Sequence, residues 1–337
     1  MSSRMGVAVV AEAPGRVVVE ERPADEPTQG QVLIRTSASL ISSGTELTAL
    51  LGKEPAGTLW AGGSFPYDTG YSNVGRVVDV GPGVDQSWIG RRVGSYRPHA
   101  SYVLESADQV RPVHRDEVGD DQATFFILAE TVMNGLRRGR VQFGESVVVF
   151  GLGILGQLAA RLCLLVGADK VIVVDTADRR LALAPSDPRI VAVNPGRDRV
   201  VEVVTDHTRG RMADLAIELT GDPNVIPSEI ATLHDEGRLV ILSSPRGSGT
   251  VFNFHDLCNW PSHSIIGAHF RSHPERPTPA NPWTHGRHSE LFFDVVAEGR
   301  LDIASMITHR YPCREAPAAY EMLMEDRSAA LGVVLEW

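Results

Sequence analysis

The feature that most constrains this chain is the stretch 146–175, which reads as strand, glycine turn, helix and second strand. A β-branched run, Val147–Phe150, fits a buried parallel strand. The pattern G-x-G-x-x-G follows at once, at Gly151–Gly156, and apolar residues then recur at helical spacing over 157–166. The run Val171–Val174 reads as the next strand. A glycine turn between strand and helix within one βαβ unit is typical of dinucleotide-binding domains.

Each part of this stretch has a physical role. Gly151 permits the tight turn, Gly153 leaves room for a pyrophosphate, and Gly156 lets the helix pack closely on the strand. The start of the helix offers unpaired N–H groups and its positive dipole end to the phosphates. Asp175 lies 19 residues beyond Gly156, where its carboxylate can bind ribose hydroxyls and repel a 2′-phosphate.

The sequence therefore predicts NAD as the cofactor. NADP is the less favoured alternative, because arginines follow at 179–180 and could meet a phosphate. The residues predicted to bind the cofactor here are Gly151, Leu152, Gly153, Ile154, Leu155, Gly156, Asp175 and Arg180.

Composition narrows the class of protein. A chain of 337 residues suggests two domains, and 43% hydrophobic with 22% charged residues is ordinary for a soluble globular protein. The net charge of −10 disfavours nucleic acid as a partner. The three cysteines are far apart, which indicates neither a disulfide framework nor a thiolate zinc site. We expect no membrane span and no signal peptide, and hence a cytoplasmic protein.

Regions on either side of the βαβ unit differ in pattern. Residues 1–115 hold short apolar runs punctuated by glycine and proline, which favours a barrel or sandwich. After the unit, strand and helix patterns alternate, with strands expected at 190–193, 214–219, 238–243 and 264–268. Ligands of a doubly wound sheet lie at the carboxyl ends of its strands. The strand-end candidates for contact with ribose and nicotinamide are Thr220, Gly221, Ser243 and Ser244, although each also fits plain turn chemistry.

Two further runs carry a family resemblance. The run Gly75–Val84, followed by Ile89–Gly94, resembles a pattern of the medium-chain dehydrogenase/reductase superfamily. The segment Met306–Pro312, together with Val333–Trp337, resembles the closing segment of that family. The resemblance covers nearly the whole chain and implies an α/β fold with two domains. These are a GroES-like β-rich catalytic domain (1–122 and 288–337) and a doubly wound Rossmann NAD-binding domain (123–287), with the active site in the cleft between them. It also implies a homodimer formed through the last Rossmann strand, Ser264–Ala268.

The zinc-dependent branch of the family carries Cys-Gly-Thr-Asp and Gly-His-Glu motifs. The matching stretches here are Ser-Gly-Thr-Glu at 43–46 and Gly-Tyr-Ser at 70–72, and the third ligand position falls near Ile127. Catalytic zinc needs three nitrogen, sulfur or carboxylate ligands, which serine and tyrosine do not supply. We therefore predict no metal; the alternative is a site assembled from the eleven histidines.

Without a Lewis acid, hydrogen-bond donors must stabilise the developing charge. Thr45 matches the family's proton-relay hydroxyl, and Tyr71 offers a phenol in place of the lost histidine. The alternatives are a hydroxyl that caps the following turn and an aromatic that fills the vacated pocket. Glu130 lies in an apolar helix pattern over 125–136, where the family helix approaches the nicotinamide. It is either an acid or base, or an exposed residue of the helix surface.

The segment 269–288 is rich in histidine, arginine and proline and is longer than the usual connection of the family. It is either a binding segment for a polyhydroxylated or anionic substrate, or a solvated loop. The residues predicted to contact substrate are Ser43, Thr48, Trp283 and His285.

These patterns favour a zinc-independent, NAD-dependent oxidoreductase that acts on a small polyhydroxylated alcohol or ketone. Its motifs resemble the bacteriochlorophyllide dehydrogenase-like subgroup and the sugar or cyclitol oxidoreductases. The first alternative is an enone or quinone (C=C) reductase of the same superfamily, the usual chemistry of zinc-free members. The second is a non-catalytic NAD-binding sensor. The sequence does not name the substrate or the direction of hydride transfer.

Overall fold

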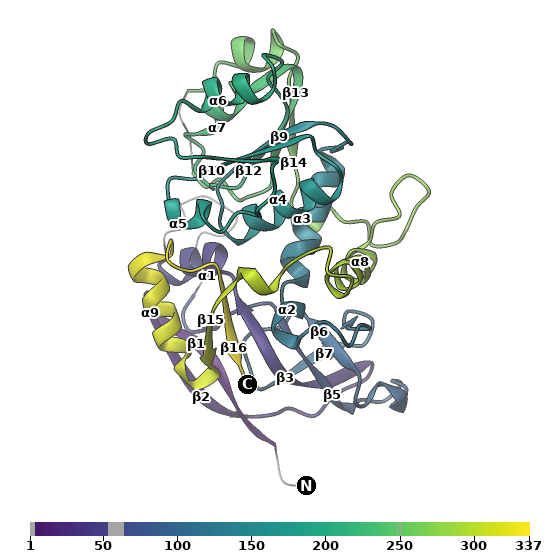
Figure 1. The fold of residues 1–337 in the computed structure, drawn as a ribbon. Coiled ribbons are helices and arrows are strands. Elements are labelled where there is room, and N and C mark those ends of the chain that lie inside the picture. Colours follow the sequence, from purple (N-terminus) through teal and green to yellow (C-terminus); the bar gives the residue numbers. More distant parts are fainter. Residues whose placement is uncertain (1–3, 53–63, 248, 250) are drawn as a thin grey trace. The chain divides into compact units, whose positions relative to one another are not determined.

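A computed structural model of the chain describes residues 4–52, 64–247, 249 and 251–337 (Figure 1). The contacts divide the chain into two compact units. The first, the β-rich unit, is Met1–Ile127 with Gly286–Trp337; the second, the cofactor unit, is Leu128–His285. The division lies close to the expected domain limits of 122/123 and 287/288. No helix among the described residues is long and apolar enough to cross a membrane.

The β-rich unit contains two sheets. The smaller has the order β2 (Arg16–Pro23), β1 (Met5–Ala13) and β4 (Tyr67–Asp68). The larger has the order β15 (Ile307–Pro312), β16 (Gly332–Glu336), β3 (Gln31–Ile41), β5 (Asn73–Val80), β6 (Arg92–Ser95) and β8 (Arg111–Pro112), and β7 (Tyr102–Ser106) pairs with β3. The C-terminal strands thus complete a sheet that the N-terminal strands begin.

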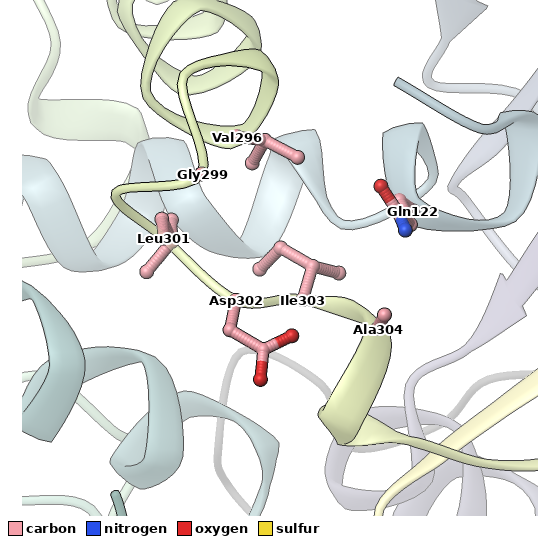
Figure 2. A pocket seen from close by; sticks show the side chains of 7 residues that line it. All are labelled: Gln122, Val296, Gly299, Leu301, Asp302, Ile303 and Ala304. Atoms are coloured by element: carbon pink, nitrogen blue, oxygen red, sulfur yellow. The ribbon is translucent and has the colours of Figure 1, made fainter. Parts of the chain in front are cut away.

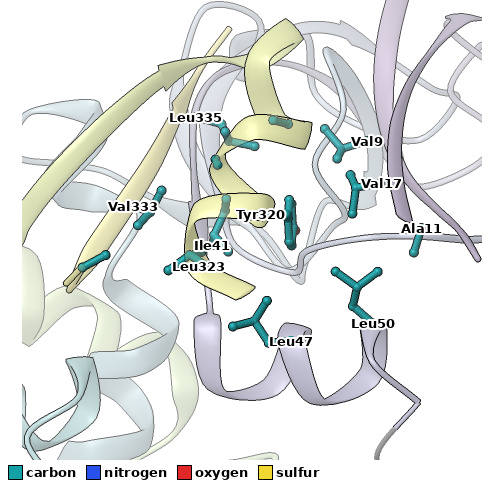
Figure 3. Close-up of a cluster of buried hydrophobic side chains, with 13 residues drawn as sticks. Val9, Ala11, Val17, Ile41, Leu47, Leu50, Tyr320, Leu323, Val333 and Leu335 are labelled. Atoms are coloured by element: carbon teal, nitrogen blue, oxygen red, sulfur yellow. The ribbon is translucent and has the colours of Figure 1, made fainter. Parts of the chain in front are cut away.

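Helices of the β-rich unit cover one of its cores. The helix α1 (Ser43–Leu50) and the C-terminal α9 (Ala316–Asp326) meet there, around the fully buried Tyr320 (Figure 3). Alternate residues of β1 and β16, as expected for strands with one buried face, complete the cluster together with Val17 of β2 and Ile41 of β3. The other helical segments of this unit are η1 (Gln86–Trp88), α2 (Asp120–Ala123), α8 (His285–Ala297), η4 (Ala304–Met306) and η5 (Cys313–Glu315). Of these, α8 starts at the last residue of the cofactor unit.

The cofactor unit is built on a parallel sheet. Its order is β11 (Ile190–Val193), β10 (Lys170–Val174), β9 (Ser146–Phe150), β12 (Ala213–Glu218), β13 (Leu233–Ile241) and β14 (Ser264–Gly267). All the neighbouring pairs are parallel, and the strand order reverses between β9 and β12, as in doubly wound dinucleotide-binding sheets. The α/β fold class expected from the sequence is confirmed.

Helices of the cofactor unit follow the strands, except for α3 (Phe126–Arg138), which enters it from the β-rich unit. The helices α3 and α4 lie close to the helix patterns expected at 125–136 and 157–166, whereas the short α5 and α7 were not predicted. The remaining helices are α4 (Ile154–Leu165), α5 (Asp178–Leu181), α6 (Val200–His207), α7 (Ile226–Ile230), the π-helical η2 (His255–Asn259) and η3 (Phe270–Ser272).

Candidate active site

The glycine turn has the geometry that a pyrophosphate requires. Gly151 has a φ of +89°, and a Cβ there would lie 2.7 Å from the Leu219 carbonyl oxygen. A Cβ at Gly156 would lie 1.8 Å from the Gly151 carbonyl oxygen, so only glycine allows the helix this close to the turn. At Gly153, by contrast, no described atom lies within 4 Å of a Cβ position, and α4 begins at the next residue. The turn therefore offers open space beside a helix N-terminus, with Ile154 and Leu155 in the first turn, and this fits a dinucleotide phosphate.

Asp175 closes β10 and faces the glycine turn. Its Oδ2 accepts a hydrogen bond from the Leu152 amide at 2.7 Å, and its Oδ1 accepts one from the Ala177 amide at 2.8 Å. The Arg180 guanidinium lies 3.7 Å from Oδ2, so the carboxylate also has a cationic neighbour. The structure brings the predicted Asp175, Leu152 and Arg180 together at the ribose end of the expected site.

The strand-end candidates gather around a carboxylate that the sequence analysis missed. Glu218, the last residue of β12, is fully buried. Its Oε1 accepts hydrogen bonds from the Thr220 amide (2.7 Å), the Thr220 hydroxyl (2.7 Å) and the Gly221 amide (2.8 Å), and its Oε2 accepts one from the Ser243 hydroxyl. Ser244 is exposed. An acidic residue at the end of a buried strand, just before Thr-Gly, was the available signal.

Hydroxyl candidates of the β-rich unit lie on α1, a helix of eight residues that the sequence analysis did not predict in full. Ser43 begins this helix and Thr45 is an exposed residue within it, so the prediction that Thr45 caps the following turn is wrong. The Thr48 hydroxyl donates to the Gly44 carbonyl at 2.7 Å, one helical turn back.

Tyr71 lies beside the start of this helix. Its hydroxyl donates to Ser42 Oγ at 2.6 Å. Burial raises the pKa of Tyr71 to about 12, and the nearby Glu46 charge adds to the rise, while hydrogen bonds with Ser42 and Thr45 oppose it. The phenol therefore keeps its proton at neutral pH and acts as a hydrogen-bond donor. The structure brings Tyr71 and Thr45 together, as the motif comparison predicted for two cooperating hydroxyls.

Glu46 anchors the same region. Its Oε1 accepts from the Ser42 amide at 2.7 Å, and its Oε2 accepts from the Tyr320 hydroxyl and lies 3.4 Å from His99 Nε2. Burial and the Glu46 charge raise the pKa of Tyr320 well above its usual value. His99 is fully buried. No sequence pattern pointed to His99 or Tyr320, which come from distant parts of the chain.

The positions that match zinc ligands carry the wrong chemistry for a cation. Ser43 and Tyr71 offer neutral hydroxyls, the Ser72 hydroxyl donates to the Thr124 carbonyl at 2.6 Å, and Ile127 is buried and apolar. In the part of the chain that the structure describes, no group of three or more His, Cys, Asp or Glu residues could hold a metal ion. These residues do not fit a catalytic zinc, which needs three nitrogen, sulfur or carboxylate donors.

Glu130 is fully buried on α3, so the prediction of an exposed position is wrong. Its Oε2 lies 2.8 Å from Nδ1 of His285. Trp283 lies under the guanidinium of Arg137, with 3.2 Å from the guanidinium carbon to the ring centroid. Two predicted substrate residues, Trp283 and His285, therefore pack against α3. Between its two anchored ends, the segment 269–288 has exposed residues at 275–281. This part of the segment fits the alternative of a solvated loop.

A separate pocket of about 270 Å³ lies in the β-rich unit (Figure 2). It contains none of the predicted site residues. Its lining residues are Gln122, Val296, Gly299, Leu301, Asp302, Ile303 and Ala304.

Comparison with known proteins places the chain in a family. A family model described as "Zinc-binding dehydrogenase" matches residues 155–285. L-threonine 3-dehydrogenase of Xanthomonas campestris is 26% identical over 371 residues, covering 99% of this chain and all of that protein. D-guloside 3-dehydrogenase of Escherichia coli is 24% identical over 272 residues, covering 79% of this chain and 77% of that protein. The chain belongs to the medium-chain dehydrogenase/reductase superfamily. The matched family segment does not include positions 43, 71 and 72, which correspond to the ligand motifs of the zinc-dependent branch.

Solved structures share the fold over the full length. Galactitol-1-phosphate dehydrogenase of Escherichia coli superposes with a TM-score of 0.83 at 18% identity, over 98% of this chain and 100% of that one. An Escherichia coli alcohol dehydrogenase complexed with NADH gives 0.82 at 17% identity, over 100% of both chains. A dehydrogenase of Sinorhizobium meliloti bound to NADP gives 0.81 at 21% identity, over 99% of this chain and 100% of that one. At these identities the likeness establishes the fold, a GroES-like domain with a Rossmann domain.

Proposed function

We propose that this superfamily member is an NAD-dependent, zinc-independent oxidoreductase. It transfers hydride between the nicotinamide and a small polyhydroxylated, sugar- or cyclitol-like alcohol or ketone. The observation that carries the proposal is the open glycine turn at Gly153, with Asp175 facing it from the end of the next strand.

The cofactor supplies the hydride acceptor or donor, and the chain's own residues hold it. Gly151–Gly156 and the first turn of α4 receive the pyrophosphate, and Asp175 receives the ribose hydroxyls. The carboxylate disfavours a 2′-phosphate, which supports NAD over NADP. Arg180, at 3.7 Å from Asp175, weakens that discrimination without reversing it. Among the structural neighbours, one is complexed with NADH and another is bound to NADP.

The residue types at the ligand positions support zinc independence. With Ser43, Tyr71 and Ser72 there, the β-rich unit offers neutral hydroxyls. When substrate is bound, the neutral phenol of Tyr71, with Thr45 beside it, turns its hydroxyl hydrogen from Ser42 to a carbonyl or alkoxide oxygen, in place of a metal. The relatives' names, a D-guloside 3-dehydrogenase and a galactitol-1-phosphate dehydrogenase among them, support a polyhydroxylated substrate.

Three measurements test this function. Calorimetry with NAD, NADH, NADP and NADPH should show binding that is tighter for the non-phosphorylated pair. Elemental analysis of the purified protein should show no stoichiometric zinc. A panel of D-gulosides, galactitol 1-phosphate, cyclitols, butanediols and L-threonine should show reduction of NAD by at least one polyol. Absence of pyridine-nucleotide binding refutes the proposal, and tight NADH binding with no turnover on the panel favours the non-catalytic sensor.

A second candidate is reduction of a conjugated C=C bond. The same replacement of zinc ligands supports it, because an enolate needs only a hydrogen-bond donor. NADH consumption should be compared on a cyclic enone and on its saturated ketone. Faster consumption on the enone favours this candidate.

We also propose a homodimer formed through β14. This strand is at one edge of the cofactor sheet, and its Ile265 is 39% exposed. An exposed apolar edge is suited to pairing across a two-fold axis. Light scattering should give the dimer mass, and Ile265→Lys should give the monomer. The control Val201→Lys, at an exposed position of α6, should leave the dimer intact.

A further inference from the structure

Glu130 and His285 form a pair of a buried carboxylate and an imidazole. Glu130 is fully buried, whereas the side chain of His285 is 23% exposed. The carboxylate Oε2 and the imidazole Nδ1 are 2.8 Å apart. An ionised carboxylate only accepts hydrogen bonds, so the ring carries its hydrogen on Nδ1. The nitrogen that can exchange a proton with a bound hydroxyl is then Nε2.

Packing holds the imidazole in this orientation. His273 stacks on His285 with ring centroids 3.7 Å apart and an interplanar angle of 24°, and Phe270 lies 4.2 Å away by the same measure. His273 donates from Nδ1 to the Phe270 carbonyl at 2.7 Å, which fixes its own ring. Of the groups that face His285, Glu130 is acidic and His273 is titratable.

The segment that supplies His285 is fastened along one face of α3. Glu130 binds His285, Asn134 donates to the Ser272 hydroxyl at 2.8 Å, and Arg137 covers Trp283. Arg138 donates to the Gly267 carbonyl at 2.8 Å. The spacing 130, 134, 137 and 138 is that of one helix face, so a single helix orients the whole segment.

Close contacts of α3 with the sheet show where the pair lies in the cofactor unit. A Cβ at Gly139 would lie 2.7 Å from Val240, one residue before the end of β13, and one at Gly135 would lie 2.7 Å from Leu242, just past that end. The helix therefore runs toward the carboxyl edge in the direction of its N-terminus. Glu130 lies five residues further in that direction, a rise of about 7 Å along the helix axis.

This edge is where a doubly wound sheet binds its ligand. Asp175 assigns the adenosine half to β10, and the glycine turn after β9 takes the pyrophosphate. The nicotinamide half then extends over β12, β13 and β14, the side of the sheet on which α3 and its segment are fastened.

We propose that His285, oriented by Glu130, is the general base and acid of this enzyme. The inference rests on the proposed function and names the residue that transfers the proton in that reaction. In alcohol oxidation, Nε2 takes the hydroxyl proton as the C–H hydride moves to NAD, giving the ketone, NADH and an imidazolium paired with Glu130. In the reverse direction, the imidazolium returns the proton to the carbonyl oxygen. His285 is the catalytic residue, and Glu130 is a positioning residue that stabilises the imidazolium.

One test needs no substrate. Protein labelled with ¹⁵N-histidine, with and without NADH, reports the hydrogen on each ring nitrogen, and the His285 signals are assigned by their loss in His285→Gln. The expected result at pH 8 is a neutral ring with hydrogen on Nδ1, and loss of that preference in Glu130→Leu, which removes the acceptor. A ring with hydrogen on Nε2, or a doubly protonated ring at pH 8, overturns the proposal. This readout is independent of whether the panel finds a substrate.

The second test uses whichever polyol the panel identifies. His285→Gln should lower kcat at least 100-fold, change the KM for NAD less than threefold, and remove the fall in rate toward acidic pH that a histidine base causes. Added imidazole should restore part of the rate of His285→Ala, which a structural role does not explain. Glu130→Gln should lower kcat about tenfold and shift the acidic limb.

The matched control is His255→Gln. His255 also pairs with a carboxylate, Asp256, at 2.7 Å, but its side chain is 65% exposed. The kcat of His255→Gln should stay at the wild-type level. A kcat within threefold of wild type for His285→Gln, with no rescue by imidazole, assigns the pair a packing role and overturns the proposal.

Discussion

Replacing one buried acid should remove most of the pH dependence of stability in the cofactor unit. Glu229 on α7 is fully buried, and neither of its carboxylate oxygens has a hydrogen-bond partner among the described residues. Burial, with the charges of Glu218 and Asp222 nearby, raises the pKa of Glu229 from 4.5 to about 9. The folded protein thus holds this carboxyl neutral at physiological pH.

The sign follows from proton binding. Below pH 4.5 the carboxyl is protonated in both the folded and the unfolded chain. Between pH 4.5 and 9 the unfolded chain releases the proton and the folded chain keeps it, so stability falls as pH rises. At about 1.4 kcal/mol per pH unit, the loss between pH 5 and pH 8 is about 4 kcal/mol. Glu229→Gln has no proton to bind, so its stability relative to wild type should rise by that amount.

The assay is urea unfolding of wild type and Glu229→Gln at pH 5, 6, 7 and 8. Hydrogen exchange at the amides of β12, corrected for its intrinsic pH dependence, isolates the cofactor unit from the β-rich one. The control Glu202→Gln removes a carboxyl that is 61% exposed on α6 and should show no such trend. A difference between wild type and Glu229→Gln that stays constant across these pH values would refute the reasoning.

Four further substitutions separate cofactor binding, folding and chemistry. A Cβ at Gly153 meets open space in the protein, so Gly153→Ala should leave the melting temperature within about 2 °C of wild type, yet weaken NAD binding about tenfold by crowding the pyrophosphate. Gly156→Ala, whose Cβ would lie 1.8 Å from the Gly151 oxygen, should instead lower the free energy of unfolding by about 3 kcal/mol. Equal effects of the two variants in calorimetry and in thermal melts would contradict both predictions. Asp175→Ala should lower NAD affinity about tenfold while leaving NADP affinity nearly unchanged, and an unchanged ratio of the two dissociation constants would argue against its ribose role. Tyr71→Phe should lower kcat about 100-fold but leave the pH profile of kcat unchanged below pH 10, because the pKa of Tyr71 is about 12. A change of kcat with pH near neutrality that disappears in Tyr71→Phe would show that the phenol ionises during turnover.

Local signals allowed most of the fold to be predicted. The strand at 190–193 matches β11, and the helix pattern at 125–136 agrees with α3 to within two residues at each end, because apolar periodicity and turn residues lie close together in the chain. The expected strand at 238–243 missed the first part of β13, which begins at Leu233 and includes the exposed Asp235 and Glu236. The eight-residue α1 is too short for a clear period, so Thr45 was placed outside the helix that contains it.

Where a site joins residues that are far apart in the sequence, the individual residues could be predicted but not their contact. Glu130 and His285 were both candidates, but their 2.8 Å contact joins positions 155 residues apart and depends on how the segment after β14 packs on α3. The burial of Glu229 depends likewise on packing that no short pattern records. The glycine turn succeeded because its strand, helix and acid lie within one supersecondary unit.

The replaced zinc positions and the new pair fit one physical account. The hydroxyls at those positions donate to protein oxygens, with Ser72 bound to Thr124 and Tyr71 bound to Ser42, and a phenol whose pKa is about 12 accepts no proton near neutrality. A base that works near neutrality must be another side chain, and histidine is the one that ordinarily titrates in that range. A carboxylate buried in an apolar helix is strongly destabilising unless it is paired. The segment that brings His285 to Glu130 therefore stabilises the buried charge, and under our proposal it also supplies the proton acceptor.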